Sequence, residues 1–595
     1  MLTASLHSSN RLVRKSVLRM FPASFAVSLT GSIGIMMDTL LAGSMISQSA
    51  IAAVAIGLPA IGIFQALTQT ITSGAIIKMS IYSGRGDRDG VNRAFSMGIL
   101  ATVLTGLFFL AVCLRLAEPI AMVFGGSAAP AVAAQAALYI RGASVCVLMG
   151  SVNIFLSKTL TLYGLQGASF IAALIAVLGN VFFSILYIHL FPAELAIAAL
   201  GVGTWCGGSL AVLLSILTIR VKKLPLHLSL KHLRLAELPS IIKLGLPTSG
   251  NNLADGVVAA VINNIIVRAF GGDTTALSTY TAVKGVVQFA LTPILGTTVA
   301  SAPLFGILYG ARDRSAILRT LRESFKVGFC VSTAWSCVLI ALLPFLGRFY
   351  GMQGDPTFRS GVIFCLLFMP LHLITRLFVQ IYESTEKVAT GLLFSIIPDS
   401  VIYPILLTLL IPSLGYWGIW ISYIANTLPF MVILYLSRSV KYRSFHTNFD
   451  RLLCLDESVR DNVPMLDISI PAGNTDVTGI SAQVHAFLSA EGASARTAYI
   501  TALCLEEMAA DFVTHIEQQD LRDANRTVMD LKLFSGDDSF RIIMRNAAKP
   551  YNPLDFRYDD ATFAKIGVKM VQKFAKHIDY NYVYKLNIVT IDVAK

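Results

Sequence analysis

The sequence predicts an α-helical polytopic membrane protein: twelve transmembrane helices, arranged as two six-helix repeats, followed by a soluble α+β two-layer domain. Three observations support this prediction. Of 595 residues, 55% are hydrophobic and only 14% are charged, whereas charged residues form about 25% of a typical soluble protein. Twelve apolar runs are long enough to cross a bilayer, which takes about 20 residues per helix. Beyond residue 446 the apolar runs shorten to the lengths of strands and short helices.

The twelve predicted spans fall at residues 17–43, 49–80, 94–115, 132–156, 166–191, 195–220, 239–270, 275–308, 324–349, 361–382, 389–412 and 415–437. The connections after the second, sixth and eighth spans, and the segment after the twelfth, are rich in Lys and Arg. The alternate connections carry little charge. By the positive-inside rule, both termini are expected in the cytoplasm.

The charge balance and the cysteines narrow the class of protein further. The net charge of +12 divides into 31 Lys+Arg against 14 Asp+Glu for residues 1–446, and 16 against 21 for residues 447–595. A basic membrane part indicates loops that face anionic lipid and not nucleic acid. The eight cysteines are isolated and predict neither a disulfide framework nor a metal site. The first span follows a basic cluster and lacks a short apolar segment with a cleavage site, so it is expected to stay as an anchor.

An internal repeat links the two halves of the membrane part. Residues 84–93 align with residues 310–319 at a constant offset and share Gly, Asp-Arg, a β-branched apolar residue and Arg. Each copy follows the second span of a six-span half. The alternative is a chance match between two basic loops. Two parallel six-span repeats are an architecture typical of transporters, in which the substrate binds between the two halves.

Asp38 is the one acid inside the predicted N-terminal spans, in the apolar run from Val17 to Ala42. A charge at the bilayer centre costs about 2.5–3.5 kcal/mol on insertion scales, so an intramembrane Asp predicts a functional site. Burial disfavours the ionised form of a carboxylate, and a protonation that alters the preferred conformation is what coupling to a gradient requires. The alternative is a structural Asp satisfied by Thr30 or Thr39.

Residues 15–440 resemble the multidrug and toxic compound extrusion (MATE) transporters. The segments that carry the resemblance are Pro22, Met37–Gly43, Ala50–Pro59, the Ser83–Arg93 loop, Gly164–Gly167, Asn180, Gly245–Pro247 and Gly271–Asp273. The resemblance implies a two-lobed exporter, with an N-lobe at about 15–222 and a C-lobe at about 235–440. It also implies a bacterial cytoplasmic (inner) membrane. The expected activity is efflux of small organic, cationic or amphipathic compounds by alternating access, with a proton or sodium ion as the coupling ion and no other cofactor.

The resemblance also assigns site residues. Asp38 corresponds to the cation-linked carboxylate of the N-lobe, and Asn180 to an amide that binds it or a cation. Ser184 stands where many members carry a second Asp, which favours proton over sodium coupling. Asp255 is expected to supply a C-lobe carboxylate. Ser184 is also a candidate cavity residue, and Arg376 and Glu383 are expected to line a C-lobe cavity. The alternative is a structural role for Asn180 and an interfacial position for Asp255 and Glu383. A lipid-precursor flippase and a membrane-anchored signalling kinase are the alternative functions.

The tail, residues 447–595, is expected to form strands at 465–470, 528–534, 540–545, 579–585 and 587–593 and helices at 475–490, 495–517 and 562–577. It resembles the GHKL ATP-binding domains of anti-sigma-factor serine kinases and histidine kinases, through Leu503–Asp511, Pro550–Leu554 and Ile566–Val568.

The resemblance places the catalytic base on Glu507, the magnesium ligand on Asp511 and the adenine-reading acid on Asn546, with one loop glycine kept as Gly567. Other loop glycines are replaced by Ala548 and Lys565. Because backbone must approach phosphate closely where those glycines stand, a degenerate site is expected that does not bind ATP or Mg²⁺. We therefore expect the protein to be a transporter and not an enzyme. The tail is expected to regulate transport or to bind a cytoplasmic protein.

Overall fold

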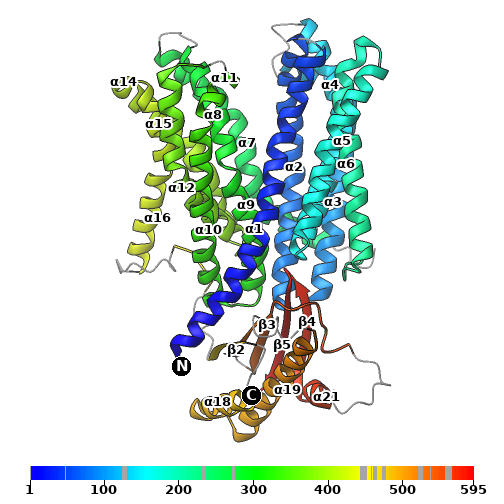
Figure 1. Cartoon of the computed structure of the whole chain (residues 1–595), viewed down its shortest axis with the longest axis vertical. Helices are drawn as coiled ribbons and strands as arrows, with labels where there is room; N and C mark the ends of the chain where they lie inside the picture. Colours follow the sequence, from blue (N-terminus) through cyan, green and yellow to red (C-terminus); the bar gives the residue numbers. More distant parts are fainter. Residues whose placement is uncertain are drawn as a thin grey trace.

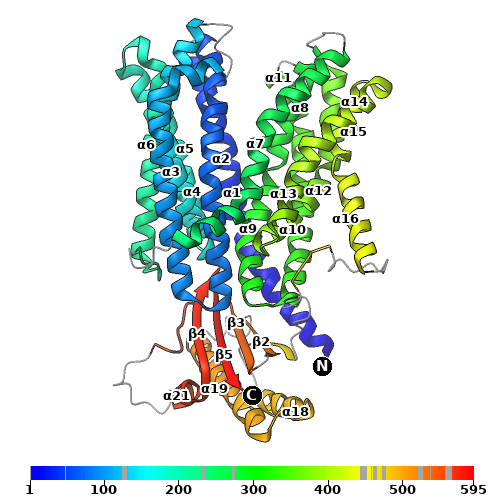
Figure 2. The ribbon, with the colours of Figure 1, turned by 180° about the vertical axis from the view of Figure 1, so that it is seen from behind.

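The computed structural model describes residues 2–46, 48–123, 130–228, 235–270, 275–350, 352–442, 452–456, 459, 466–471, 477–519, 527–536, 538–555 and 566–595. Two helical bundles stand side by side, and an α+β domain lies against one end of both (Figures 1 and 2). Both chain ends lie at that end, which we call the tail side (Figure 1). We call residues 466–595 the tail domain.

The first bundle, the N-bundle, contains six long helices and two short helical turns. They are α1 (Leu2–Leu41), η1 (Ala42–Ile46), α2 (Gln48–Arg85), α3 (Arg88–Val123), α4 (Pro130–Leu162), α5 (Gln166–Leu190), η3 (Ala193–Leu195) and α6 (Ala196–Val221). Helix α1 starts on the tail side and runs to the opposite end (Figure 1). Asp38 therefore lies near the far end of α1, and not midway along it.

The second bundle, the C-bundle, has more interruptions. It contains η5 (Leu235–Glu237), α7 (Leu238–Ala269), α8 (Thr275–Ala290), α9 (Thr292–Gly310), α10 (Arg314–Ala341), α11 (Leu343–Phe349), α12 (Pro356–Ser384), α13 (Val388–Ile396), the π-helix η6 (Ile397–Ile402), α14 (Tyr403–Leu414), α15 (Tyr416–Ala425) and α16 (Thr427–Tyr442). Prolines near the starts of α9 and η6, Pro293 and Pro398, accompany two of the breaks, because proline removes a helical hydrogen bond.

Ten helical segments among the described residues are long and apolar enough to cross a membrane. They cover ten of the predicted spans. Helices also occupy the two remaining intervals, with α7 at the seventh and the pair α15–α16 at the twelfth. A polytopic helical membrane part is thus confirmed, and the count of twelve spans stays a prediction.

The bundles touch through glycines on the tail side. A Cβ on Gly84 of α2 would lie 1.9 Å from the carbonyl oxygen of Ile307 in α9, and a Cβ on Gly310 would lie 2.1 Å from the carbonyl oxygen of Ile81. Gly310 is the repeat equivalent of Gly84, and Ile307 is that of Ile81, because the same number of residues separates each pair. The contact between α2 and α9 is therefore reciprocal, as an internal repeat predicts.

This crossing predicts a position-dependent effect of adding one methyl group. We expect Gly84→Ala to lower the free energy of unfolding by about 1–3 kcal/mol through overpacking, because the backbone of α9 leaves no space for a Cβ. Gly62→Ala is the control on the same helix, since nothing lies within 4 Å of a Cβ there. Thermal unfolding of the two variants in detergent measures the difference, and equal melting temperatures would contradict the close crossing.

The tail domain is an α+β fold with one antiparallel sheet. Its elements are β1 (Leu466–Pro471), α18 (Val477–Ala490), α19 (Ala495–Gln519), β2 (Val528–Ser535), β3 (Ser539–Asn546), α21 (Ile566–Phe574), β4 (Ala575–Val583) and β5 (Leu586–Ala594), with strand order β1-β2-β3-β5-β4. The predicted α+β region is confirmed. The predicted helix 562–577 is too long at its C-terminal end, because β4 already begins at Ala575.

The two faces of the sheet pack against different partners. Ile542 and Met544 of β3 join the core under α18, α19 and α21, whereas Ile543 between them joins a core that also contains residues of both bundles. This alternation is the period of two expected of a strand that is covered on both faces. The sheet is therefore sandwiched between its own helices and the bundles (Figure 1).

Candidate functional site

Asp38 lies in a buried polar cluster inside the N-bundle. Its side chain is 8% exposed. The Nδ2 of Asn180 on α5 donates to Asp38 Oδ1 at 3.1 Å, and the hydroxyl of Tyr139 on α4 donates to Oδ2 at 3.0 Å. The hydroxyl of Thr204 on α6 lies 3.3 Å from Oδ1. One carboxylate thus joins four helices.

Ser184 belongs to the second layer of this cluster. Its hydroxyl donates to Asn180 Oδ1 at 2.9 Å, and Thr204 Oγ1 lies 3.1 Å from the same oxygen. Asn180 therefore accepts on its oxygen and donates to Asp38 with its nitrogen. Ser184 is fully buried and acts on Asp38 through Asn180.

Glycines bring these helices close enough for the cluster to form. A Cβ on Gly203 of α6 would lie 2.1 Å from the Oγ of Ser184, so α5 and α6 pack together only because Gly stands there. A Cβ on Gly57 of α2 would lie 2.6 Å from the ring of Tyr139. The small residues near the second and sixth spans thus make room for the groups that surround Asp38.

The sequence pointed to Asp38, Asn180 and Ser184 but missed Tyr139 and Thr204. A buried Tyr needs a partner for its hydroxyl, and that rule was the signal available for Tyr139. The expected structural partner Thr30 donates instead to the carbonyl of Ala26 at 2.7 Å. The side chain of Thr39 lies outside the described residues.

A cavity of about 270 Å³ lies beside α1, α4 and α5. Thr30 and Gly31 of α1 and Ala176 and Val177 of α5 line it; in sequence they precede Asp38 and Asn180 on the same two helices. One lining residue, Lys158 of α4, is charged. We call this space the N-bundle cavity.

Of the C-bundle residues named from the sequence, Glu383 and Arg376 lie within the described part of the chain. The side chain of Asp255 lies outside the described residues. Glu383 is buried near the tail-side end of α12 and acts electrostatically on Lys158 of the N-bundle. It does not line the N-bundle cavity.

Arg376 belongs to a different group, around the π-helix η6. Both Arg376 and Asp399 of η6 act electrostatically on His372, which lies one turn before Arg376 on α12. Asp399 Oδ1 accepts a hydrogen bond from Asn426 Nδ2 at 2.8 Å. Asp399 is not among the site residues predicted from the sequence, although π-helical turns are frequent at functional sites.

The loop aspartates of the internal repeat have a shared structural role. Asp87 Oδ1 accepts from the backbone N–H of Gly90 at 2.7 Å, and Asp313 Oδ1 accepts from that of Ala316 at 3.0 Å. Each Asp thus caps the start of the helix that follows. The surroundings differ, because Asp87 is 39% exposed whereas Asp313 is fully buried under the tail domain.

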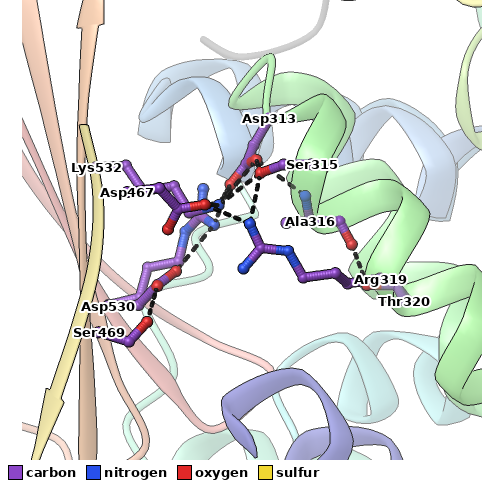
Figure 3. Close-up of polar contacts among 10 residues, drawn as sticks. Asp313, Ser315, Ala316, Arg319, Thr320, Asp467, Ser469, Asp530 and Lys532 are labelled. Atoms are coloured by element: carbon purple, nitrogen blue, oxygen red, sulfur yellow. Dashed lines mark hydrogen bonds and ion pairs between the residues drawn. The ribbon is translucent and has the colours of Figure 1, made fainter. Parts of the chain in front are cut away.

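Asp313 binds two cations of the sheet. Lys532 Nζ of β2 lies 2.9 Å from Asp313 Oδ2, and Arg545 of β3 lies 2.6 Å from the same oxygen. Figure 3 shows Lys532 pointing from the sheet to Asp313 at the start of α10. Burial alone would raise the pKa of Asp313, but the Lys532 and Arg545 cations hold the pKa well below its usual value. A second pair, Arg319 with Asp467 of β1, lies beside the first.

The turn between β4 and β5 reaches both bundles. The backbone N–H of Tyr584 donates to the carbonyl of Leu162 at the end of α4, at 2.9 Å. Its hydroxyl donates to the carbonyl of Ala300 in α9. Tyr584 is fully buried, and both Tyr584 and Lys585 have a φ of 56°. This tight turn is therefore a wedge between the N-bundle and the C-bundle.

Of the residues named for a nucleotide site in the tail domain, Glu507 and Gly567 contact each other, whereas Asp511 and Asn546 bond to other residues of the domain. Tyr551 donates its hydroxyl to Asp511 Oδ2 at 2.8 Å and stacks on His515, with ring centroids 3.6 Å apart. Asn546 is 1% exposed, and its Oδ1 accepts from Asn587 Nδ2 at 2.9 Å. A Cβ on Gly567 of α21 would lie 1.7 Å from Glu507 Oε2 of α19. Lys565 lies outside the described residues.

Two helical bundles, with one carboxylate buried among four helices of the first, are the architecture expected of a secondary transporter. A family model described as MatE matches residues 22–186 and 256–406, together more than half of the chain. The chain belongs to the MatE family. No curated protein sequence is significantly similar to it. The match ends before the tail domain.

Solved structures with the same fold are MATE transporters. A MATE in complex with MaD3S has a TM-score of 0.64 and 17% identity, over 73% of this chain and 98% of that one. An outward-facing MATE family multidrug resistance transporter has a TM-score of 0.63 and 17% identity, over 72% and 96%. The MATE multidrug transporter DinF-BH, solved in a ligand complex, has a TM-score of 0.61 and 18% identity, over 72% and 96%.

Proposed function

We propose that the protein is a proton-coupled exporter of small organic, cationic or amphipathic compounds, with twelve spans, both termini in the cytoplasm and a bacterial inner membrane as its site. The observation that carries this proposal is the Asp38 cluster. Asp38 is buried, and its oxygens accept hydrogen bonds from an amide and from hydroxyls. A hydroxyl can donate to the carboxylate or, after rotation, accept from the protonated acid, so the cluster can bind either form of Asp38. Protonation of Asp38 then changes how α1 is held by α4, α5 and α6.

Proton coupling is favoured over sodium coupling by the chemistry of the cluster. Among the described residues, the groups around Asp38 are neutral: Asn180, Tyr139, Thr204 and Ser184. Hard cations such as sodium need several oxygen ligands, by analogy with other hard ions. A single acid with three neutral hydrogen-bond donors around it is better suited to a proton. Asp255 remains a proposed C-lobe carboxylate.

Proteoliposomes that contain the protein test the transport proposal. Exchange of a labelled organic cation such as tetraphenylphosphonium is measured first, without any gradient, and then with a pH gradient and a sodium gradient imposed separately. We expect exchange without a gradient and net movement driven by the pH gradient alone. Net movement driven by sodium alone would contradict proton coupling, and absence of exchange would contradict the transport proposal itself.

We further propose that the tail domain regulates transport by holding the tail-side ends of the bundles together. Support comes from its contacts with both: Arg88 of α3 donates to the carbonyl of Tyr580, whereas Asp313 before α10 binds Lys532 and Arg545. Tyr584 bonds to both bundles. In an alternating-access cycle the bundles must separate on this side, and each of these contacts opposes that step.

The tail domain is proposed to be a degenerate GHKL-like module that does not bind nucleotide. The carboxylate of Asp511 accepts from Tyr551, and the oxygen of Asn546 accepts from Asn587, so both are engaged within the protein. The free Nδ2 of Asn546 has no partner among the described residues, but it is a donor, and an adenine amino group needs an acceptor.

Calorimetry of the full-length protein in detergent with Mg-ATP tests this point. We expect no binding heat up to about millimolar nucleotide, which corresponds to less than about 4 kcal/mol of binding free energy. Saturable binding, or transfer of phosphate to a protein, would favour the signalling-kinase alternative. Tyr551→Phe removes the hydrogen bond to Asp511 while keeping the ring stacked on His515, and we expect no nucleotide binding in this variant either.

A further inference from the structure

We propose that the N-bundle cavity binds the carboxylate, or a similar oxyanion, of an amphipathic substrate, with Lys158 as the cationic partner of that group. This inference rests on the proposed transport function and adds a chemical class of substrate to it. It predicts that the protein favours compounds carrying an acidic group over otherwise identical compounds without one.

The charge of the cavity wall is the first support. Lys158 is the one charged residue among the described residues that line the cavity. Its Nζ donates to Ser73 Oγ of α2 at 2.8 Å, which leaves two of its three N–H donors available. Within the described part of the chain Lys158 forms no ion pair within 4.0 Å, although Glu383 of the C-bundle acts on it at longer range. A half-buried ammonium without a close counter-charge favours an anionic ligand.

The neutral polar groups of the wall are the second support. Ser24 Oγ, Asn153 Oδ1 and Gln166 Oε1 belong to lining residues and have no hydrogen-bond partner among the residues that the structure describes. Ser24 is 1% exposed and Gln166 is 3% exposed. Buried oxygens of this kind are costly unless a donor reaches them. The oxyanion of the ligand pairs with Lys158, and an N–H or O–H group of the ligand satisfies one of these oxygens once that side chain turns toward the cavity.

The position of the cavity relates the inference to transport. Lining residues of α1 and α5 precede Asp38 and Asn180 on the same helices. At its tail side, Thr161 and Val299 line the cavity, and their chain neighbours Leu162 and Ala300 hold Tyr584. The oxyanion site therefore lies between the Asp38 cluster and the wedge of the tail domain. A volume of about 270 Å³ admits a substituted ring with its acidic group.

A matched pair of dyes tests the inference on the full-length protein in detergent. 7-Diethylaminocoumarin-3-carboxylic acid and its methyl ester share one small fluorescent ring system, and the ester lacks the free carboxylate. Fluorescence anisotropy gives the Kd of each dye for the wild type, Lys158→Met and Lys158→Arg. We expect the wild type to bind the acid at least about tenfold more tightly than the ester, which is about 1.4 kcal/mol. Lys158→Met is expected to lose this preference, and Lys158→Arg to retain most of it.

Each outcome has one meaning. Equal Kd values of acid and ester for the wild type, or an acid preference that survives in Lys158→Met, would overturn the oxyanion site and leave the transport proposal standing. Absence of binding and exchange for both dyes would instead count against the proposed function. Ser73→Ala removes the hydrogen bond and keeps the ammonium, so the acid preference is expected to persist in it. Size-exclusion profiles identify any variant that fails to fold.

Discussion

Asp38→Asn is expected to abolish transport driven by a pH gradient, with a loss of at least about 100-fold in the initial rate, since one missing titration removes the whole coupling step. Asparagine is close in shape to aspartate: its oxygen still accepts from Asn180 and its amide nitrogen can donate to the hydroxyl oxygen of Tyr139, so the packing is largely kept. It cannot exchange a proton. A substitution that removes the titration and preserves the packing therefore separates coupling from folding. Initial rates in proteoliposomes measure the effect.

Exchange of substrate without a gradient is the companion measurement for Asp38→Asn. We expect the variant to exchange substrate and to fail only in gradient-driven movement. Ser184→Ala is the matched control in the same cluster, because Ser184 contacts Asn180 and does not reach Asp38; its rate is expected to fall only a few-fold. Unchanged gradient-driven transport by Asp38→Asn would overturn the assignment of the coupling residue.

Asp313→Asn is expected to detach the tail domain from the C-bundle and to raise the transport rate several-fold. Asparagine still caps α10 through its side-chain oxygen, since Asn and Asp are equally good caps. It removes the negative charge that Lys532 and Arg545 share. Breaking a buried ion pair by removing one partner costs about 3–5 kcal/mol. Hydrogen exchange of β2 and β3 measures detachment, and proteoliposome transport measures its consequence.

Two variants control the Asp313 experiment. Asp538→Asn removes an exposed acid between β2 and β3 and is expected to change neither exchange nor transport. Asp592→Asn is the second control, because it removes a carboxylate that pairs with Arg541 inside the sheet and, among the described residues, makes no ion pair with the bundles, and it is expected to leave the transport rate unchanged. A detached tail domain with an unchanged transport rate would contradict the regulatory proposal.

The docking contact also has a predictable dependence on pH. The cations hold the pKa of Asp313 below its usual value, so the unfolded state binds more protons than the folded state as the solution is acidified. The contribution of this group is fully present above about pH 4, near the pKa of an ordinary Asp, and is lost below that. Docking is therefore expected to be stable across the physiological range.

The sequence by itself determined the helical membrane part and the α+β tail domain, and it singled out Asp38 as the candidate coupling acid. Apolar runs of spanning length and an alternating pattern in strands are local signals, because the bilayer and the sheet impose them on consecutive residues. Asp38 was singled out because charged groups inside such runs are rare, whereas Asn180 was named through the resemblance to MATE transporters. The repeat predicted equivalent loops, and both copies proved to cap a helix.

Only the tertiary structure decided which groups meet. Tyr139 and Thr204 reach Asp38 from helices far apart in the chain, and their spacing in the sequence carries no sign of it. The charged residues of β2 and β3 have the alternation of a solvent-exposed face, yet the loop before α10 covers them and buries Lys532. Hydrophobic periodicity shows that one face of a strand is polar. It does not show whether that face contacts water or residues of opposite charge.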